Sequence, residues 1–332
     1  MDKKYDIYGI GNALVDMEFE VTSDFFETHG IEKGLMTLVE EDRQNELILA
    51  LRKHVTKKQS GGSAANTLIG ASQFGSKCFY SCKVAKDEMG DFYMHDLEKA
   101  NVKTNLNGMP RAEGLTGKCL VMITPDADRT MNTFLGITSQ FSETELDEEA
   151  LKDSKYLYIE GYLITSEGGR RAMKRAKKVA EKYGVKTALT FSDPNMVKFF
   201  KDQMDEVIGA SVDLLFCNED EAMTYTGTND INVACEELKK VAKRFAITQG
   251  KNGALIFDGD TFIDIKPYPV KAIDTNGAGD MFAGAYLYAI THGHSHAEAG
   301  KIASLASSRV VSQFGPRLDN GAARKILEEL YL

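Results

Sequence analysis

Short apolar stretches alternate with helical stretches along most of this chain, and this alternation limits the possible fold more than any other feature. The predicted strands lie at residues 5–10, 79–84, 155–159, 187–191, 213–217, 244–248, 253–257 and 261–265. The predicted helices lie at residues 168–183, 219–226, 279–291, 296–311 and 321–331. Strands that alternate with such helices form βαβ units, in which helices cover both faces of a parallel sheet. The sequence therefore predicts a doubly wound α/β fold with a mostly parallel central sheet.

Two stretches interrupt this alternation. The first has alternating segments at 17–21 and 35–39, followed by a predicted helix over 41–53. The second is typical of a β-hairpin, with strands at 117–124 and 129–135 around a Pro-Asp-Ala-Asp turn. We expect both stretches to meet in space as one small β-sheet subdomain. The predicted large domain comprises 1–16, 58–112 and 137–332, and the predicted subdomain comprises 17–57 and 113–136.

Charge and hydropathy exclude several classes of protein. The chain has 332 residues, with 40 Lys and Arg against 49 Asp and Glu, a formal net charge of −9. Because nucleic-acid-binding proteins usually carry a basic excess or a basic stripe, we expect no nucleic-acid partner. We see no apolar run of about 18 residues and no signal peptide, so we expect no membrane partner. The scattered cysteines are expected to be buried reduced thiols, which favours a cytoplasmic location. The sequence leaves open whether the protein is a monomer or a homodimer.

The strongest motif is Asp-Thr-Asn-Gly-Ala-Gly-Asp at residues 274–280, directly before an apolar helical stretch. The small residues at 277–279 let the backbone turn tightly, and the positive end of a helix dipole adds to the free amide groups there. The loop therefore predicts an anion site. Asp280 lies in the first helical turn, where a carboxylate can accept a proton from a hydroxyl that attacks phosphorus. The alternative is that Asp280 only caps the helix.

Two further motifs contain residues suited to holding a sugar. The segment Ser-Gly-Gly-Ser-Ala-Ala-Asn-Thr at 60–67 leads a glycine pair into a helix of small residues, so that the backbone can approach a ligand closely. Asn66 in this segment offers both a donor and an acceptor. The segment 11–16 follows the first strand, and its Asn12 and Asp16 can bind neighbouring hydroxyls. Each motif taken alone is a weak signal and favours a loop without a ligand.

Two motifs at strand ends suit a nucleotide. Asn-Glu-Asp-Glu at 218–221 would suit a hydrated Mg²⁺ that also contacts phosphate oxygens, or it could be a polar helix N-terminus. Residues 248–253 could carry a nucleotide or form a hairpin turn. The chain has no P-loop motif, and Leu14 replaces the third glycine of a dinucleotide fingerprint. The three histidines within 292–296 favour a solvated loop over a metal site.

Taken together and in order, these motifs resemble the ribokinase-like family of carbohydrate and nucleoside kinases, the PfkB family, over nearly the whole chain. The resemblance implies a doubly wound α/β domain with a β-sheet lid, and the small subdomain would be that lid. Within the family the chain is most similar to the adenosine kinases, because Asn276 is the third residue of the 274–280 motif and because 11–16 has the spacing of their ribose grip. Residues 38–42 resemble the lid segment whose apolar residue packs on the purine.

The resemblance implies in-line transfer of the γ-phosphoryl group of ATP to a 5′-hydroxyl, with Mg²⁺ as cofactor and, as in several family members, a monovalent cation such as K⁺. The implied catalytic residues are Asp280, Gly277, Ala278, Gly279 and Arg129. The implied acceptor-binding residues are Asn12, Asp16, Leu38, Gly61, Gly62, Ser63, Asn66 and Asn276. The implied ATP-binding residues are Asn218, Glu221, Thr248, Gly250, Gly253 and Ser307. The implied metal contacts are Glu221, to Mg²⁺ through water, and Asp274, to the monovalent cation.

The expected activity is therefore that of a purine-nucleoside kinase acting on adenosine. Inosine, guanosine or a plain sugar remain open as acceptors, because residues 64–65 and the hairpin 126–135 depart from the eukaryotic adenosine kinases. A nucleotide-responsive sensor built on a kinase fold without catalysis is the non-enzymatic alternative.

Overall fold

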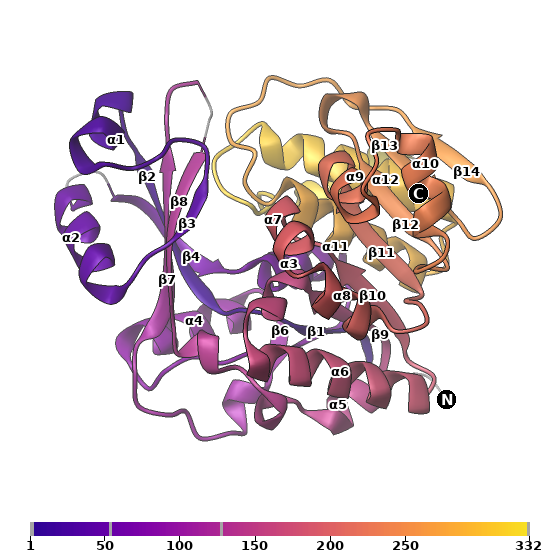
Figure 1. Cartoon of the computed structure of the whole chain (residues 1–332), viewed down its shortest axis with the longest axis horizontal. Coiled ribbons are helices and arrows are strands. Elements are labelled where there is room, and N and C mark those ends of the chain that lie inside the picture. The colour runs from indigo at the N-terminus through magenta and orange to yellow at the C-terminus, as the bar shows by residue number, and fades with distance from the viewer. Residues whose placement is uncertain (1–2, 53–54, 127–128, 331–332) are drawn as a thin grey trace.

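The computed structural model describes residues 3–52, 55–126 and 129–330. Figure 1 shows two bodies: a large α/β domain and a small sheet with two helices beside it. Four positions in the predicted elements lie outside the described residues, namely Lys53, Ala127, Asp128 and Tyr331.

The large sheet runs in the order β14-β13-β12-β11-β10-β9-β1-β5-β6. Its strands are β1 (Tyr5–Ile10), β5 (Cys78–Ser81), β6 (Val102–Thr104), β9 (Ser154–Glu160), β10 (Lys186–Thr190), β11 (Leu214–Asn218), β12 (Phe245–Thr248), β13 (Ala254–Phe257) and β14 (Phe262–Ile265). All neighbours from β6 to β12 are parallel, whereas β13 and β14 pair antiparallel at one edge. The predicted doubly wound, mostly parallel fold is confirmed.

Helices cover both faces of the large sheet, and each face has its own apolar core. One face packs against α3 (Ser63–Phe74), α4 (Glu88–Lys99), α11 (Ala278–Thr291), α12 (His296–Val311) and α13 (Ala322–Glu329). The other packs against α5 (Glu148–Lys152), α6 (Glu167–Lys182), α7 (Pro194–Phe199), α8 (Lys201–Ile208), α9 (Glu219–Thr226) and α10 (Ile231–Leu238). Burial on both faces is seen in β1, all of whose residues are buried, Asp6 included.

The strand order reverses direction at β1, which has β5 on one side and β9 on the other. In open α/β sheets a ligand crevice forms outside the carboxyl ends of the strands at such a switch point. The loops after β1, β9, β10, β11 and β12 all leave the sheet at this edge. The topology therefore brings the motifs that begin at Gly11, Asn218 and Thr248 to one side of the molecule.

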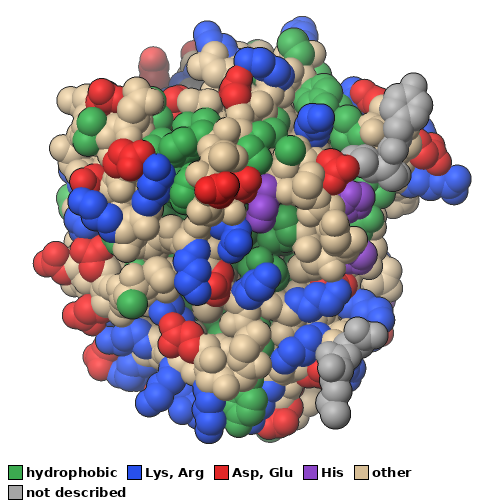
Figure 2. Space-filling model, turned by 90° about the vertical axis from the view of Figure 1, so that its right-hand side faces the viewer, with side chains coloured by type: hydrophobic (Ala, Val, Ile, Leu, Met, Phe, Trp, Pro, Cys, Tyr) green, Lys and Arg blue, Asp and Glu red, His purple; other side chains and the backbone are tan. Residues whose placement is uncertain are grey.

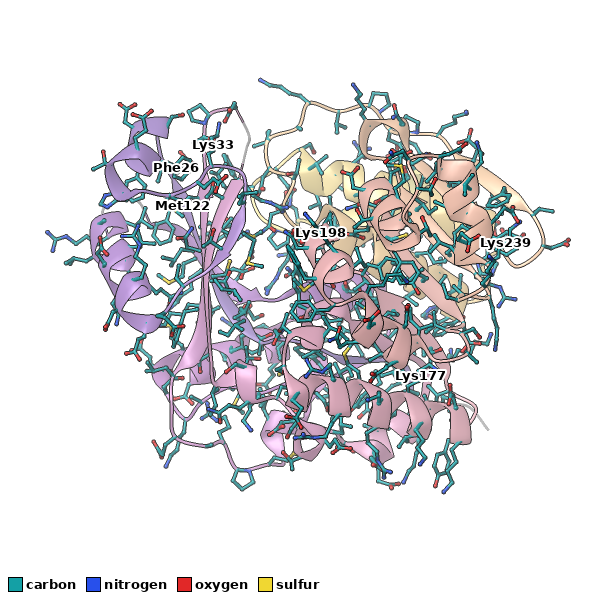
Figure 3. The ribbon with its side chains drawn as sticks, viewed as in Figure 1. Phe26, Lys33, Met122, Lys177, Lys198 and Lys239 are labelled. Carbon is teal, nitrogen blue, oxygen red and sulfur yellow. The ribbon has the colours of Figure 1, made fainter. Side chains whose placement is uncertain are left out.

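The small sheet has the order β3-β8-β7-β2-β4. Its strands are β2 (Leu14–Glu20), β3 (Met36–Leu38), β4 (Val55–Gly61), β7 (Thr116–Ile123) and β8 (Arg129–Gly136), and α1 (Ser23–His29) and α2 (Glu41–Leu51) cover one face. Phe26 of α1 and Met122 of β7 belong to the apolar cluster between these helices and the sheet (Figure 3). The opposite face of the small sheet is turned toward the large domain (Figure 1).

The small sheet extends past the predicted subdomain ranges. β2 begins at Leu14 and β4 continues to Gly61, so both strands run directly into the motifs at 11–16 and 60–67. Gln59 of β4 donates a hydrogen bond to Glu18 of β2 at 2.9 Å, and this polar pairing explains why β4 lacks an apolar alternation. The helix α1 was also absent from the predicted elements. The sugar-holding motifs are therefore continuous with the small sheet.

The surface opposite the small sheet carries acidic and basic side chains interspersed with one another (Figure 2). In the described residues, no helix is both long and apolar enough to cross a membrane. Cys78, Cys82, Cys119, Cys217 and Cys235 are buried and free, as predicted.

Candidate active site

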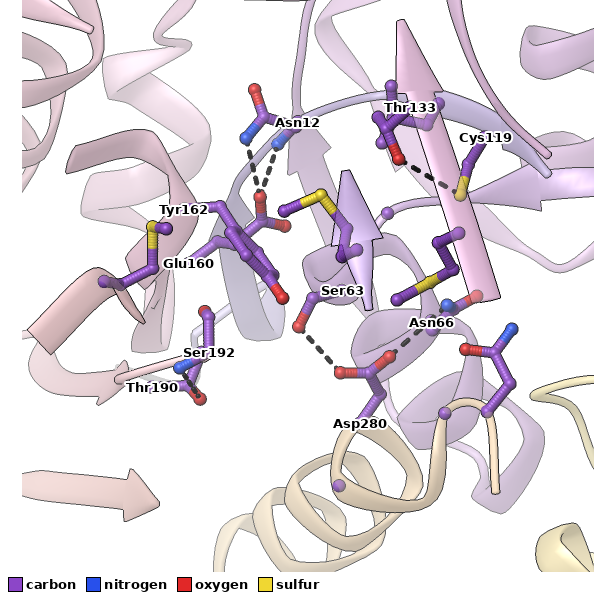
Figure 4. A pocket seen from close by; sticks show the side chains of 18 of the residues that line it. Asn12, Ser63, Asn66, Cys119, Thr133, Glu160, Tyr162, Thr190, Ser192 and Asp280 are labelled. Atoms are coloured by element: carbon purple, nitrogen blue, oxygen red, sulfur yellow. Dashed lines mark hydrogen bonds between the residues drawn. The ribbon is translucent and has the colours of Figure 1, made fainter. Parts of the chain in front are cut away.

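A cavity of about 310 Å³ lies between the carboxyl edge of the large sheet and the small sheet. Figure 4 shows side chains from both bodies turned into it. The predicted site residues that line it are Asn12, Asp16, Leu38, Gly62, Ser63, Asn66, Arg129, Asn218, Glu221, Thr248, Asn276, Gly277, Ala278, Gly279 and Asp280. Motifs separated by up to 268 residues in the sequence thus share one cavity.

Asp280 is half-buried in the first turn of α11. Its Oδ1 accepts a hydrogen bond from the Ser63 hydroxyl at 2.7 Å, and its Oδ2 accepts one from the Asn66 amide at 3.3 Å (Figure 4). Burial raises the pKa of Asp280 to about 6, although these hydrogen bonds and the charge of Arg129 oppose the rise. A carboxylate with this pKa is ionised at neutral pH and close enough to it to act as a general base.

The anion loop, residues 274–280, leads into the N-terminus of α11 through Gly277, whose φ of +70° favours glycine. A Cβ atom at Gly277 would lie 2.2 Å from Cβ of Pro316, so the position is also sterically closed. At Gly279 the situation is the opposite, because a Cβ atom there would have no protein atom within 4 Å. Open space therefore adjoins the first turn of α11, where an anion could approach the helix N-terminus.

Arg129, the first residue of β8, connects the small sheet to the anion loop. Its Nη1 donates a hydrogen bond to Oδ1 of Asn276 at 2.8 Å. The guanidinium thus lies at the cavity wall beside the start of α11. A positive charge here would lie near an anion bound on the loop, and the role of Arg129 toward the phosphates stays a prediction.

Glu160, at the end of β9, was not predicted as a site residue. Its Oε1 accepts hydrogen bonds from the backbone and side-chain amides of Asn12 at 3.0 and 2.9 Å, and its Oε2 accepts one from the Ala64 amide at 2.8 Å. Burial raises its pKa to about 7 against these hydrogen bonds. Glu160 therefore fixes Asn12 and the start of α3 relative to each other. No sequence motif marks Glu160, which reaches the site because β9 pairs with β1 in the sheet.

Asp16 and the glycine pair form a tight polar corner. A Cβ atom at Gly61 would lie 2.0 Å from Oδ2 of Asp16, and one at Gly62 would lie 2.0 Å from the Asn12 carbonyl oxygen. Gly62 also has a φ of +95°. Glycine is required here because two backbones and a carboxylate meet. Burial, with the charge of Glu18 adding to it, raises the pKa of Asp16 to about 8, while Arg317 and Arg129 act against the rise.

Asn218 and Glu221 cap α9 reciprocally. The Asn218 side chain accepts from the Glu221 amide at 2.8 Å, and both Glu221 oxygens accept from Asn218 at 3.0 Å. The alternative interpretation of this motif as a helix N-terminus is therefore correct as local structure. Burial raises the pKa of Glu221 to about 7, with nearby Asp193 and Asp220 adding to it. Because a cation would relieve that cost, the buried carboxylate also fits a Mg²⁺ held through water.

The remaining predicted residues have structural contacts outside the cavity lining. Gly253, in the β12–β13 hairpin, has a φ of +99°, and a Cβ atom there would lie 2.0 Å from the Ile265 carbonyl oxygen of β14. Gly250 has a φ of +53° in the same hairpin turn. The Ser307 hydroxyl donates to the Ala278 carbonyl at 2.8 Å. Asp274 accepts backbone hydrogen bonds from Asn276 and Gly315 at 2.8 and 2.9 Å. These contacts shape the anion loop and the hairpin, and the roles of these residues toward ATP or a cation stay predictions.

The small sheet gives the cavity an apolar wall. Its contributors are Leu14, Met36, Leu38, Cys119, Val121, Met131, Thr133 and Leu135. Leu38 is 53% exposed, so its side chain has room to contact a ligand. The Thr133 hydroxyl and the Cys119 thiol lie 3.3 Å apart and satisfy each other (Figure 4). This wall therefore offers a ligand mainly apolar surface.

The opposite wall contains a strained residue that the sequence did not reveal. Ser192, after β10, has a φ of +71°, which is costly for a residue other than glycine. Its hydroxyl accepts a hydrogen bond from the Gly161 amide at 2.9 Å. Backbone strain of this kind often marks functional loops. Among the described residues, no group of three or more His, Cys, Asp or Glu could hold a metal ion.

Comparison with known proteins identifies the family. The model of the pfkB family of carbohydrate kinases matches residues 35–322. The chain therefore belongs to the PfkB family of carbohydrate kinases, whose reaction class is phosphoryl transfer to an alcohol group, and the predicted family is confirmed.

Individual relatives differ in the acceptor that their names give. The adenosine kinase of Saccharomyces cerevisiae is 26% identical, with 92% of this chain and 95% of that protein covered. The structure of the adenosine kinase from Sinorhizobium meliloti is 32% identical, with a TM-score of 0.90 over 97% of this chain and 99% of that one. A probable sugar kinase from Rhizobium etli is 28% identical, with a TM-score of 0.93 over 99% and 100%.

Proposed function

We propose that this protein is an ATP-dependent kinase that transfers the γ-phosphoryl group to the 5′-hydroxyl of a purine nucleoside, with adenosine as the acceptor. The observation that carries the proposal is the content of one cavity. Asp280 in the first turn of α11, the polar residues Asn12 and Asp16, and the apolar wall of the small sheet all line it. These groups would suit a general base, a sugar and a flat base in turn. The similarity to adenosine kinases from two organisms supports the same acceptor.

The geometry supports a direct transfer. A sugar held by Asn12, Asp16 and the Gly61–Gly62 turn would direct its primary hydroxyl toward Asp280. Asp280 would accept the hydroxyl proton as the oxygen attacks phosphorus. The amides at the start of α11 and the Arg129 guanidinium would stabilise the charge on the phosphoryl group in transit, and such preorganised donors usually give the largest contribution to catalysis.

ATP would enter from the side of β11 and β12. Thr248 and Asn218 line that part of the cavity, and Glu221 would hold Mg²⁺ through water. Magnesium, when bound, supplies charge neutralisation of the phosphates. Asp274 remains the proposed neighbour of a monovalent cation.

The apolar wall distinguishes a nucleoside from a plain sugar as the acceptor. A pentose would fill the polar corner and leave the wall in contact with water, whereas a purine would cover it. Leu38→Ala removes an exposed side chain of this wall, so we expect no loss of stability and a KM for the nucleoside that rises by roughly tenfold, as for one buried aliphatic side chain. The KM for ATP should stay unchanged. Leu49→Ala, exposed on the outer helix α2, is the matched control.

The proposal is tested by measuring ADP formation from ATP with adenosine, inosine, guanosine, ribose and fructose. Turnover highest with adenosine supports it. Turnover highest with a sugar and unaffected by Leu38→Ala would replace the proposed acceptor by a carbohydrate. Binding of nucleoside without ADP formation from any acceptor would favour the sensor alternative.

A further inference from the structure

The loop between α12 and α13 contacts the anion loop and the turn at Ser60 through three consecutive residues, Gly315, Pro316 and Arg317. The Gly315 amide donates to Oδ2 of Asp274 at 2.9 Å. Pro316 packs so closely on Gly277 that a Cβ atom there would lie 2.2 Å away. Gly315 and Pro316 are both buried. Two of the three residues therefore fix the anion loop.

The third residue contacts the other half of the site. Nη2 of Arg317 donates to the Ser60 hydroxyl at 2.7 Å and also to the Ser60 carbonyl oxygen, and it lies 2.8 Å from Oδ2 of Asp96 on α4. Ser60 in turn donates to the same Asp96 oxygen through its amide at 2.8 Å and its hydroxyl at 2.7 Å. Arg317, Ser60 and Asp96 thus form a closed network.

This network holds the glycine pair in place. Ser60 directly precedes Gly61, whose carbonyl accepts a hydrogen bond from the Tyr93 hydroxyl of α4 at 2.8 Å. Gly61 is the residue against which the Asp16 carboxylate lies. The side chains of Arg317 and Asp96 are only 16% and 19% exposed, so the pair is largely shielded from water. Burial would raise the pKa of Asp96, but Arg317 and the Ser60 hydrogen bonds outweigh it and hold the pKa below its ordinary value.

We propose that Arg317 is a positioning residue for phosphoryl transfer, which joins the acceptor-binding turn at Ser60–Gly62 to the anion loop through the segment Gly315–Arg317. The inference rests on the proposed function, because the segment Gly315–Arg317 would set the distance between the two groups that react in it. The acceptor hydroxyl is placed by the turn, and the phosphoryl group is placed by the anion loop. Misplacement of reacting atoms by about 1 Å can cost about a hundredfold in rate.

Arg317→Met tests this role, because methionine keeps the apolar stem and removes every hydrogen bond. We expect kcat to fall roughly 10- to 100-fold while the KM for ATP stays within about twofold. We also expect more ADP per phosphorylated acceptor than in the parent, because water can attack when the acceptor is misplaced. A purely structural role would lower the folded fraction and leave this ratio unchanged.

Two further variants keep the test decisive if Arg317→Met folds poorly. Arg317→Lys keeps the charge but cannot contact Ser60 and Asp96 with a planar fork, so it should restore folding and only part of kcat. Ser60→Ala keeps the Arg317–Asp96 ion pair and should raise the ratio of ADP to product to a smaller extent. Arg324→Met, on the exposed face of α13 where Arg324 pairs with Glu328, is the control and should leave kcat unchanged.

Hydrogen exchange gives an answer that is independent of turnover. In Arg317→Met the amides of 60–66 and of 274–280 should both exchange faster than in the parent. A parent without turnover on any acceptor would overturn the proposed function, while joint acceleration of the two segments would still support the connection. Parent-like kcat and ADP-to-product ratio in both Arg317 variants, or unchanged exchange in either segment, would overturn the positioning role.

Discussion

Asp280→Asn is the substitution whose outcome the structure predicts in most detail. Asparagine has nearly the same shape, and its amide can face the two present partners. Its oxygen would accept from Asn66, and its NH₂ group would donate to the Ser63 hydroxyl, which can act as an acceptor. Because burial raises the pKa of Asp280 above its ordinary value, the change also removes a cost of holding a charge in the cavity. We therefore expect the Tm at pH 7 to stay the same or to rise.

The effect on catalysis should be large. A positioned general base contributes about 10²- to 10⁴-fold, which corresponds to roughly 3–5 kcal/mol of the activation free energy. We expect kcat to fall by that factor while the dissociation constant of the nucleoside, measured by calorimetry, changes little. Asp260→Asn, an exposed aspartate in the β13–β14 turn, is the matched control and should keep parent kcat.

The pH dependence of the parent provides a second measurement of the same residue. With a pKa of about 6, the base is ionised above this pH and protonated below it. The parent kcat/KM should therefore fall roughly tenfold between pH 7 and pH 5, on a limb that reports the free enzyme. The residual activity of Asp280→Asn should lack this limb. A kcat of Asp280→Asn within threefold of the parent would refute the role of Asp280 as base.

Three other predictions follow from the geometry. Gly277→Ala should lower both Tm and kcat, because the φ of Gly277 is positive and Pro316 blocks a side chain there. Gly279→Ala should keep the Tm and lose turnover, because only a bound phosphoryl group would contact the new methyl group. Equal effects of the two substitutions on Tm would contradict this reasoning. For Asp16→Asn, a folded-state pKa of about 8 means that the native parent binds more protons than its unfolded chain and loses stability as pH rises from 4 to 8. The Tm of Asp16→Asn relative to the parent should therefore increase over that range, and a difference that stays constant with pH would show that Asp16 is not held in its protonated form. Addition of EDTA should abolish ADP formation and excess Mg²⁺ should restore it, and full turnover in EDTA would exclude the Glu221 metal role.

The sequence predicted the large sheet well because its strands are buried on both faces. β1, α9 and α12 begin and end at the predicted residues, since Gly11 follows β1, Asn218 and Gly227 bound α9, and Ser295 caps the start of α12. β4 was missed for the opposite reason. It is an edge strand of the small sheet with a polar sequence, and its Gln59 satisfies a glutamate of its neighbour.

The site was predictable wherever glycine or a helix start fixed the backbone. Gly62 and Gly277 have positive φ angles, and the motifs around them line the cavity as expected. Glu160 and Arg317 were missed because each acts through contacts to segments far away in the sequence. Neither residue lies in a glycine-rich motif, so only the pairing of β9 with β1 and the path of the α12–α13 loop bring them to the site.

The central claim is phosphoryl transfer from ATP to the primary hydroxyl of a purine nucleoside. The most direct test is mass spectrometry of the products after incubation with ATP labelled with ¹⁸O in the γ-phosphoryl group, magnesium and adenosine. The account predicts a labelled adenosine 5′-monophosphate formed in equal amount to ADP. Labelled inorganic phosphate with no labelled nucleotide, or no ADP with any nucleoside or sugar, would contradict it.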